Sequence, residues 1–181
     1  IRTVVFETGS SNVLYVGTAL DGIFKSTDGG NHWNSINRGL ATVPVFSLAF
    51  DPATQTRLFA GSMSSIYLSA DAGNTWSGLD ALLTYGSVNV MTIDPTNPAN
   101  LYAGIGELIH ASDDGGRNWG FYMPIFYSDI KALVLNPRSP TTRYAATNRN
   151  GIFKSTGVGE WSTINTGLVN LNVRALILDP S

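Results

Sequence analysis

Short apolar segments recur at a nearly constant distance along the chain, and four of them run into an Asp-Pro or Asn-Pro pair. β-Branched and aromatic residues followed by such a pair are typical of a strand that ends in a turn. The segments with the pair are 45–50, 90–93, 130–135 and 173–178, and residues 1–6 have the same apolar pattern. We expect each of these segments to form a strand, which we call strand A.

Each of the first four A strands is followed by three further segments with strand character. Strand B is expected at 14–18, 58–62, 101–104 and 143–147, and strand C at 22–25, 65–68, 107–110 and 151–154. Strand D is expected to begin at each of the four tryptophans. Because no helical period is present, the sequence predicts an all-β fold of four-stranded antiparallel meanders. The predicted units are 1–44, 45–87, 88–129 and 130–172, with a surplus strand at 173–178.

A short motif of serine, aspartate, glycine and tryptophan lies between strands C and D. Its full copies are 26–33, 69–76 and 112–119, and an incomplete copy without the aspartate is 155–161. The opening serines are 43 residues apart, a period typical of stacked structural units. Since aspartate accepts backbone N–H bonds in turns and glycine supplies positive φ, the motif predicts a structural turn. Its residues are Ser26, Asp28, Gly30, Trp33, Ser69, Asp71, Gly73, Trp76, Ser112, Asp114, Gly116, Trp119, Ser155, Gly159 and Trp161.

This S-x-D-x-G-x-x-W motif resembles the Asp-box, or BNR repeat, of sialidases, sortilin-type receptors, xyloglucan-active glycoside hydrolases and photosystem II stability factors. The resemblance covers the whole chain and implies a β-propeller in which each meander is one blade. In that family the box lies on the face opposite the ligand site, so it indicates fold rather than function. The resemblance also implies an extracytoplasmic or secreted setting.

Composition narrows the class of protein. The 181 residues are 43% hydrophobic and carry a net charge of −2, which is typical of one globular domain with enough apolar surface for a core. Neither a nucleic-acid partner nor a membrane span is expected from this charge and pattern. The absence of cysteine excludes disulfides and thiolate metal sites.

The surplus strand at 173–178 leaves two interpretations open. It has the pattern of the innermost strand of a fifth blade, which favours a piece of a larger propeller. The alternative is a unit that closes on itself, or that associates with a second copy through its open blade edges, because unpaired edges invite association.

Ligand-binding candidates follow from the alternation of turns in a meander. The A–B turns and the box turns share one face, whereas the B–C turns and the D–A connections share the other, where propellers usually bind ligands. Segment 120–129 stands out because it has four aromatic residues and a carboxylate where other repeats have small or polar residues. Such rings suit a sugar or a partner's apolar anchor, or alternatively fill the core. The candidates are Tyr85, Glu107, Tyr122, Phe126, Tyr127, Asp129 and Arg149.

The sequence favours a non-catalytic scaffold that binds a protein or glycan on the B–C and D–A face. A glycosidase needs two carboxylates across a cleft, and neither the F/Y-R-I-P stretch nor the Tyr–Glu pair of sialidases is recognisable. No catalytic residue, metal site or cofactor is predicted, since the box aspartates lack calcium-loop spacing and the two histidines lie away from the expected face. The alternatives are part of a secreted glycoside hydrolase, xyloglucanase-like or sialidase-like, and an assembly factor resembling the photosystem II stability proteins.

Overall fold

Four antiparallel sheets of four strands make up the fold, and the strands of each sheet follow one another in sequence order. A computed structural model describes the chain except residues 42–43, 64, 80–85, 125–126, 158–159 and 180–181, and it describes only the backbone of 121–124. We call each sheet a blade. The described residues contain no helix, and therefore none that is long and apolar enough to cross a membrane.

The strand bounds repeat from blade to blade. Blade 1 contains β1 (Thr3–Phe6), β2 (Leu14–Gly17), β3 (Ile23–Ser26) and β4 (Asn34–Ser35). Blade 2 contains β5 (Ser47–Phe50), β6 (Leu58–Gly61), β7 (Ile66–Ser69) and β8 (Ser77–Leu79). Blade 3 contains β9 (Val88–Ile93), β10 (Leu101–Ile105), β11 (Leu108–Ser112) and β12 (Gly120–Pro124). Blade 4 contains β13 (Ile130–Asn136), β14 (Ser139–Thr147), β15 (Ile152–Ser155) and β16 (Ser162–Thr163).

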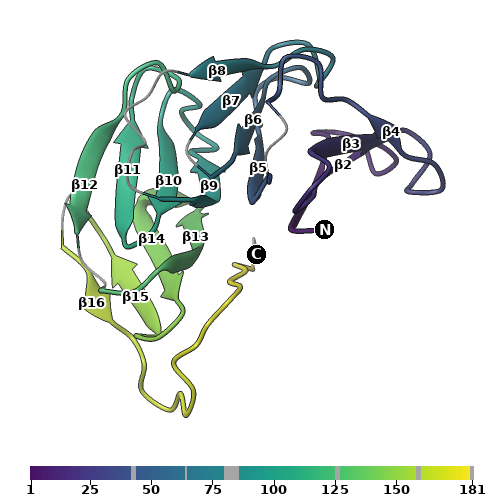
Figure 1. Cartoon of the computed structure of the whole chain (residues 1–181). Helices are drawn as coiled ribbons and strands as arrows, with labels where there is room; N and C mark the ends of the chain where they lie inside the picture. The colour runs from purple at the N-terminus through teal and green to yellow at the C-terminus, as the bar shows by residue number, and fades with distance from the viewer. Residues whose placement is uncertain (42–43, 64, 80–85, 125–126, 158–159, 180–181) are drawn as a thin grey trace.

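The blades are arranged in an arc in sequence order, with the first strand of each blade towards the centre (Figure 1). Strand β1 packs on β5, β5 on β9, and β9 on β13. The first residues of the chain and its C-terminal segment both approach the centre of the arc. The centre is therefore bordered by one strand from each blade.

Three apolar clusters fill the spaces between consecutive blades. Between blades 1 and 2, Tyr15 and Ile23 pack against Leu48, Leu58 and Trp76. The other two clusters repeat this arrangement: Phe59, Ile66, Met91, Leu101 and Trp119 between blades 2 and 3, and Tyr102, Ile109, Leu133, Ala145 and Phe153 between blades 3 and 4. Consecutive blades thus bury the faces that they turn towards each other, as expected of units too small to have a core alone.

The box turns are closed by the hydrogen bonds that their residue types predict. In the second box, Ser69 Oγ accepts from Gly73 N–H at 2.8 Å and donates to Asp71 Oδ1 at 2.8 Å. Asp71 Oδ1 also accepts the backbone N–H of Thr75 at 2.8 Å. The first and third boxes have the same three bonds. The motif acts as a turn staple in these three blades.

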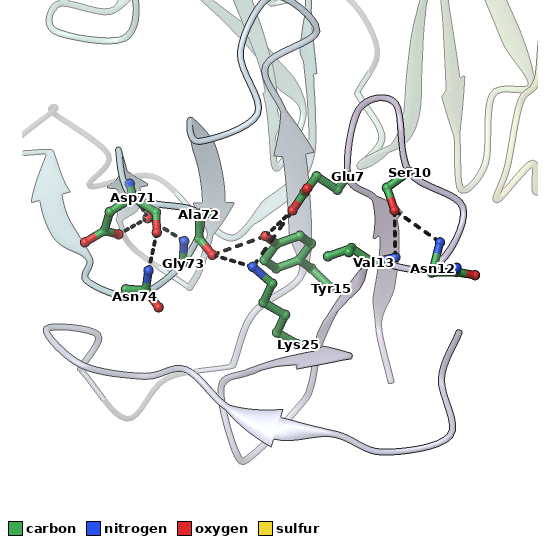
Figure 2. A network of polar contacts seen from close by, with 11 residues as sticks. Glu7, Ser10, Asn12, Val13, Tyr15, Lys25, Asp71, Ala72, Gly73 and Asn74 are labelled. Carbon is green, nitrogen blue, oxygen red and sulfur yellow. Dashed lines mark hydrogen bonds and ion pairs between the residues drawn. The ribbon is translucent and has the colours of Figure 1, made fainter. Parts of the chain in front are cut away.

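The second box also contacts the preceding blade (Figure 2). The Ala72 carbonyl accepts from Tyr15 Oη at 3.1 Å and from Lys25 Nζ at 3.3 Å. Tyr15 Oη lies 3.0 Å from Glu7 Oε2 as well, and burial followed by the Glu7 hydrogen bond raises the pKa of Tyr15 well above its usual value. A partly buried polar row therefore ties blade 1 to the box of blade 2.

The box tryptophan precedes strand D, whereas the sequence pattern predicts that it begins the strand. The D strands start one residue later, at Asn34, Ser77, Gly120 and Ser162. Trp76 Nε1 donates to the Ile36 carbonyl of blade 1 at 2.8 Å, and Trp119 Nε1 donates to the Gly116 carbonyl at 3.0 Å. These two side chains anchor the turn and the blade interface, and strand pairing begins after them.

Residues 173–178 form no strand in the structure, in contrast to the prediction of a surplus strand. In every blade, strand A pairs with the strand B that follows it. No described strand pairs with 173–178 in this way. The segment nevertheless begins as an A strand does, because Val173 N–H donates to the Thr147 carbonyl of blade 4 at 2.9 Å.

Candidate functional site

A cavity of about 460 Å³ lies at the centre of the arc, and residues from all four blades line it. It opens on the face of the B–C turns and D–A connections, because its lining comes from the beginnings of A strands, a B–C turn and the C-terminal segment. The lining residues are Arg2, Phe46, Asn89, Lys131, Asn148, Asn172 and Arg174. No other described cavity is bordered by every blade.

Five of these residues occupy the same position of the repeat. Each follows the first residue of a strand A segment, and in four cases the N–H of that first residue donates to the B–C turn of the preceding blade. The four bonds are Val45 to Thr18, Val88 to Ser62, Ile130 to Gly106 and Val173 to Thr147, all at 2.8 or 2.9 Å. Because this contact fixes the start of each segment, the next side chain is brought to the central axis. The repeat geometry therefore builds the cavity wall.

The cavity is locally positive in a chain whose net charge is −2. Arg2, Lys131 and Arg174 contribute three cations. Asp129 is the one described carboxylate paired with any of them, with its Oδ2 at 3.1 Å from Lys131 Nζ. Arg2 lies over the Phe46 ring, 5.8 Å from its centre. Three cations less one carboxylate leave two positive charges at this site.

Amide side chains complete the polar lining. Asn148 is held in place because its Oδ1 accepts from Ser128 Oγ at 2.6 Å and its backbone N–H donates to the Asp129 carbonyl at 3.1 Å. Asn148 is also one of the residues that line the cavity. With Asn89 and Asn172, the wall offers both hydrogen-bond donors and acceptors to a ligand.

A second cavity, of about 560 Å³, lies between blades 3 and 4 near the third box. Its buried cation, Arg143, lies over the Tyr102 ring at 4.5 Å and donates to Tyr102 Oη at 3.0 Å. The repeat has Leu58 and Leu101 at the position of Arg143, and both leucines are fully buried between blades. This cavity reflects a substitution within an interface, so the central cavity is the stronger candidate.

The structure describes the side chains of four of the seven predicted site residues, Glu107, Tyr127, Asp129 and Arg149. Glu107 and Arg149 are exposed in two different B–C turns, and Tyr127 is 89% exposed, so its ring is not part of the core. Tyr122 belongs to β12, but its side chain is not described, and Tyr85 and Phe126 lie outside the described residues. Among the four with described side chains, Asp129 contacts the wall of the central cavity through its ion pair with Lys131.

Both histidines lie away from this cavity. His110 is buried in β11, and burial lowers its pKa. His32 is exposed in the first box, where its Nδ1 lies 2.6 Å from Asp28 Oδ2. Within the described ranges, no three side chains of the kinds that bind metals are grouped together.

Sequence reasoning missed Arg2, Lys131 and Arg174. The signal was present in the repeats, since these residues follow Ile1, Ile130 and Val173 at one equivalent position. This signal is found by aligning the repeats and comparing the second residue of each strand A segment, instead of searching each loop separately.

Known structures share this architecture. No protein-family profile matches the chain, and no curated protein matches it by sequence. A GH74 enzyme of Niastella koreensis superposes with a TM-score of 0.79 at 21% identity, over 91% of this chain and 29% of that one. The GH74 xyloglucanase of Xanthomonas campestris gives 0.75 at 15% identity, over 94% and 31%. YCF48 from Cyanidioschyzon merolae gives 0.65 at 16% identity, over 88% and 54%.

The chain has a β-propeller fold. Identities this low show the fold alone. The chain spans under a third of the length of the two GH74 proteins and about half that of YCF48. The cavity of Arg2, Lys131 and Arg174 lies at the centre of the arc of blades, where a propeller has its axis.

Proposed function

We propose that this chain is a non-catalytic propeller scaffold that binds a glycan or a protein on its B–C and D–A face, at the mouth of the central channel. The observation that carries the proposal is the central cavity, which is lined by all four blades and polar around most of its wall. Rigid blades hold these side chains in place before a ligand arrives, so little ordering accompanies binding.

The charges at the cavity support binding over glycoside hydrolysis. Hydrolysis of a glycosidic bond uses two carboxyl groups on either side of the sugar. No described carboxylate lines the cavity, and the one that is paired with a lining cation is Asp129, at 3.1 Å from Lys131. A single neutralised carboxylate suits a positioning role rather than acid–base chemistry.

An extracytoplasmic or secreted setting is part of this proposal. Its support is the likeness of the three complete box turns to those of Asp-box proteins. Fractionation of cells that express the native gene would locate the protein, and recovery only from the cytoplasm would contradict this part.

The proposal is tested by binding and turnover measured together. The chain is screened against immobilised polysaccharides and candidate protein partners, and reducing-sugar release is followed for every glycan that binds. We expect Asn89→Ala and Asn148→Ala to weaken binding about tenfold each by removing a hydrogen bond from the cavity wall. Gln55→Ala, an exposed change in the A–B turn of blade 2, is the matched control.

Two results would overturn the proposal. Equal loss of binding in Gln55→Ala and in the cavity variants would place the site elsewhere. Release of reducing sugar that disappears in Asp129→Asn would make the protein an enzyme.

A further inference from the structure

We propose that the central cavity binds a phosphate monoester carried by a small hydroxylated molecule, such as a sugar phosphate. This inference rests on the proposed function, because it names the ligand class of the same site. Its basis is the match between the charge of the cavity and that of the ligand, together with the kind of groups that surround the charge.

The charge of the site corresponds to a dianion. Arg2, Lys131 and Arg174 supply three positive charges, and Asp129 already neutralises one of them through Lys131. A phosphate monoester carries a charge of about −1.5 to −2 at pH 7. It would balance the two remaining charges, whereas a single carboxylate would leave one of them unpaired.

The positions of the cations suit a tetrahedral anion. Arg2 precedes β1, Lys131 lies in β13, and Arg174 belongs to the C-terminal segment, so the three groups come to the cavity from three separate segments of the chain. Guanidinium groups bind phosphate oxygens in pairs, and an ammonium acts as a point charge beside them. No described carboxylate pairs with Arg2 or Arg174, which leaves both available to a ligand.

The rest of the wall favours a small polar body on the phosphate. Asn89, Asn148 and Asn172 can donate to and accept from hydroxyl groups. The guanidinium carbon of Arg2 lies 5.8 Å from the centre of the Phe46 ring and covers it. The lining therefore has little apolar surface for the anchors that a peptide would bury. A volume of about 460 Å³ is within the range of small-molecule sites.

Calorimetric titration of the chain with glucose 6-phosphate tests this inference. We expect saturable binding, with glucose and glucuronate at least about tenfold weaker because one lacks the anion and the other has a single charge. Inorganic phosphate should compete, which separates recognition of the phosphoryl group from recognition of the sugar. A phosphoserine peptide is the remaining probe.

Charge variants make the test specific. Arg2→Gln and Arg174→Gln should each weaken glucose 6-phosphate binding about tenfold, and Arg174→Lys should restore part of the loss. Arg138→Gln is the matched control, because it removes the same charge from an exposed A–B turn on the other face. Asp129→Asn should tighten binding several-fold, since it frees the charge of Lys131. Thermal melting of each variant confirms that it is folded.

Several outcomes would overturn the inference. These are glucuronate binding as tightly as glucose 6-phosphate, equal weakening in Arg138→Gln and Arg174→Gln, binding of the phosphoserine peptide alone, and no saturable binding of any phosphate ester. Binding of a neutral glycan that depends on Asn89 and Asn148 but not on Arg174 would overturn this inference and leave the proposed function standing.

Discussion

Apolar side chains are buried in the three spaces between consecutive blades, but they are exposed on one face of blade 1. No preceding blade covers that face among the described residues. Val4, Phe6 and Trp33 on this face are 50%, 56% and 38% exposed. Their counterparts in blade 2 are Leu48, Phe50 and Trp76, which belong to the cluster that packs on blade 1. The sequence pattern is the same in both blades, so the neighbouring blade decides whether these residues are buried.

This difference shows where the stability of the fold lies. A meander of about 43 residues has too little interior of its own, and the favourable burial comes from contact with the adjacent unit. Equivalent residues should therefore contribute unequally to stability. Paired substitutions at equivalent positions measure that inequality, and we expect the difference to be greatest where a neighbouring blade covers the largest side chain.

The box tryptophans should show the largest contrast. Trp76 is 5% exposed, whereas Trp33 is 38% exposed. We expect Trp76→Ala to lower the free energy of unfolding by about 3–5 kcal/mol, because it empties the space beside Tyr15 and removes the Nε1 bond to Ile36. Trp33→Ala should cost about 1 kcal/mol or less. Urea denaturation measures both, and equal losses would mean that the face of blade 1 is covered in solution.

Two glycines with the same backbone conformation provide the next contrast. Gly39 has φ of 85° and Gly167 has φ of 87°. A Cβ at Gly39 would collide with the Trp76 carbonyl of the next blade, whereas one at Gly167 would meet nothing within 4 Å. Gly39→Ala should therefore cost about 3 kcal/mol from left-handed strain and overpacking, and Gly167→Ala only about 1 kcal/mol from strain. The melting temperatures of the two variants measure this difference. Equal decreases would contradict the close contact between Gly39 and the Trp76 carbonyl.

A tyrosine pair tests the polar row shown in Figure 2. Tyr15→Phe removes the hydrogen bonds to Glu7 Oε2 and to the Ala72 carbonyl, and should cost about 1–2 kcal/mol. Tyr144 has the same place in blade 4, and within the described part of the chain its hydroxyl makes no hydrogen bond. Tyr144→Phe should change stability by less than about 0.5 kcal/mol. Urea denaturation of both variants and of the unchanged chain gives their free energies of unfolding. A larger loss of stability in Tyr144→Phe than in Tyr15→Phe would contradict this prediction.

The effect of acid pH on stability should be the smallest of these effects. It should not depend on whether a box contacts a neighbouring blade. Hydrogen bonds from the Thr75 side chain and backbone lower the pKa of Asp71 to about 2. The backbone N–H of His32 is the main cause of a still lower pKa at Asp28. Because the charged forms are favoured in the fold, their contribution is complete above the unfolded pKa of about 3.9. It is lost as the pH falls through about 2 at Asp71 and lower still at Asp28.

Asp28→Asn and Asp71→Asn should each make stability depend less on pH in that acidic range. The decrease should be similar in both variants, although of these two boxes only that of Asp71 contacts a preceding blade among the described residues. Stability measured from pH 5 to pH 2 checks this expectation. A response confined to Asp71→Asn would show that the interface, and not the turn, controls these carboxylates.

Most of the fold is predictable because it depends on local chemistry that repeats. The box turns are specified by a serine, an aspartate and a glycine within a few residues, as at Ser69, Asp71 and Gly73. Strand pairing in 173–178 could not be predicted in the same way. It requires a second strand beside the segment, and the apolar pattern of the segment carries no information about that partner.

The candidate site was less predictable than the fold. Aromatic residues close together in 120–129 give a strong local signal, and Tyr127 is nonetheless exposed to solvent. Arg2, Lys131 and Arg174 are far apart in sequence, and they meet only because strand A of each blade reaches the central axis. A site made of one residue per blade is recognised only after the repeats are aligned.

The packing of strands β1, β5, β9 and β13 in sequence order has a consequence for how the chain folds during synthesis. Each docking event joins a blade to the one made just before it, so the loop that closes has the same length every time and the entropic cost stays constant. A blade leaving the ribosome finds its docking surface already formed. Blades 2, 3 and 4 can therefore each dock as they are made, at the pace of translation, without waiting for a distant part of the chain.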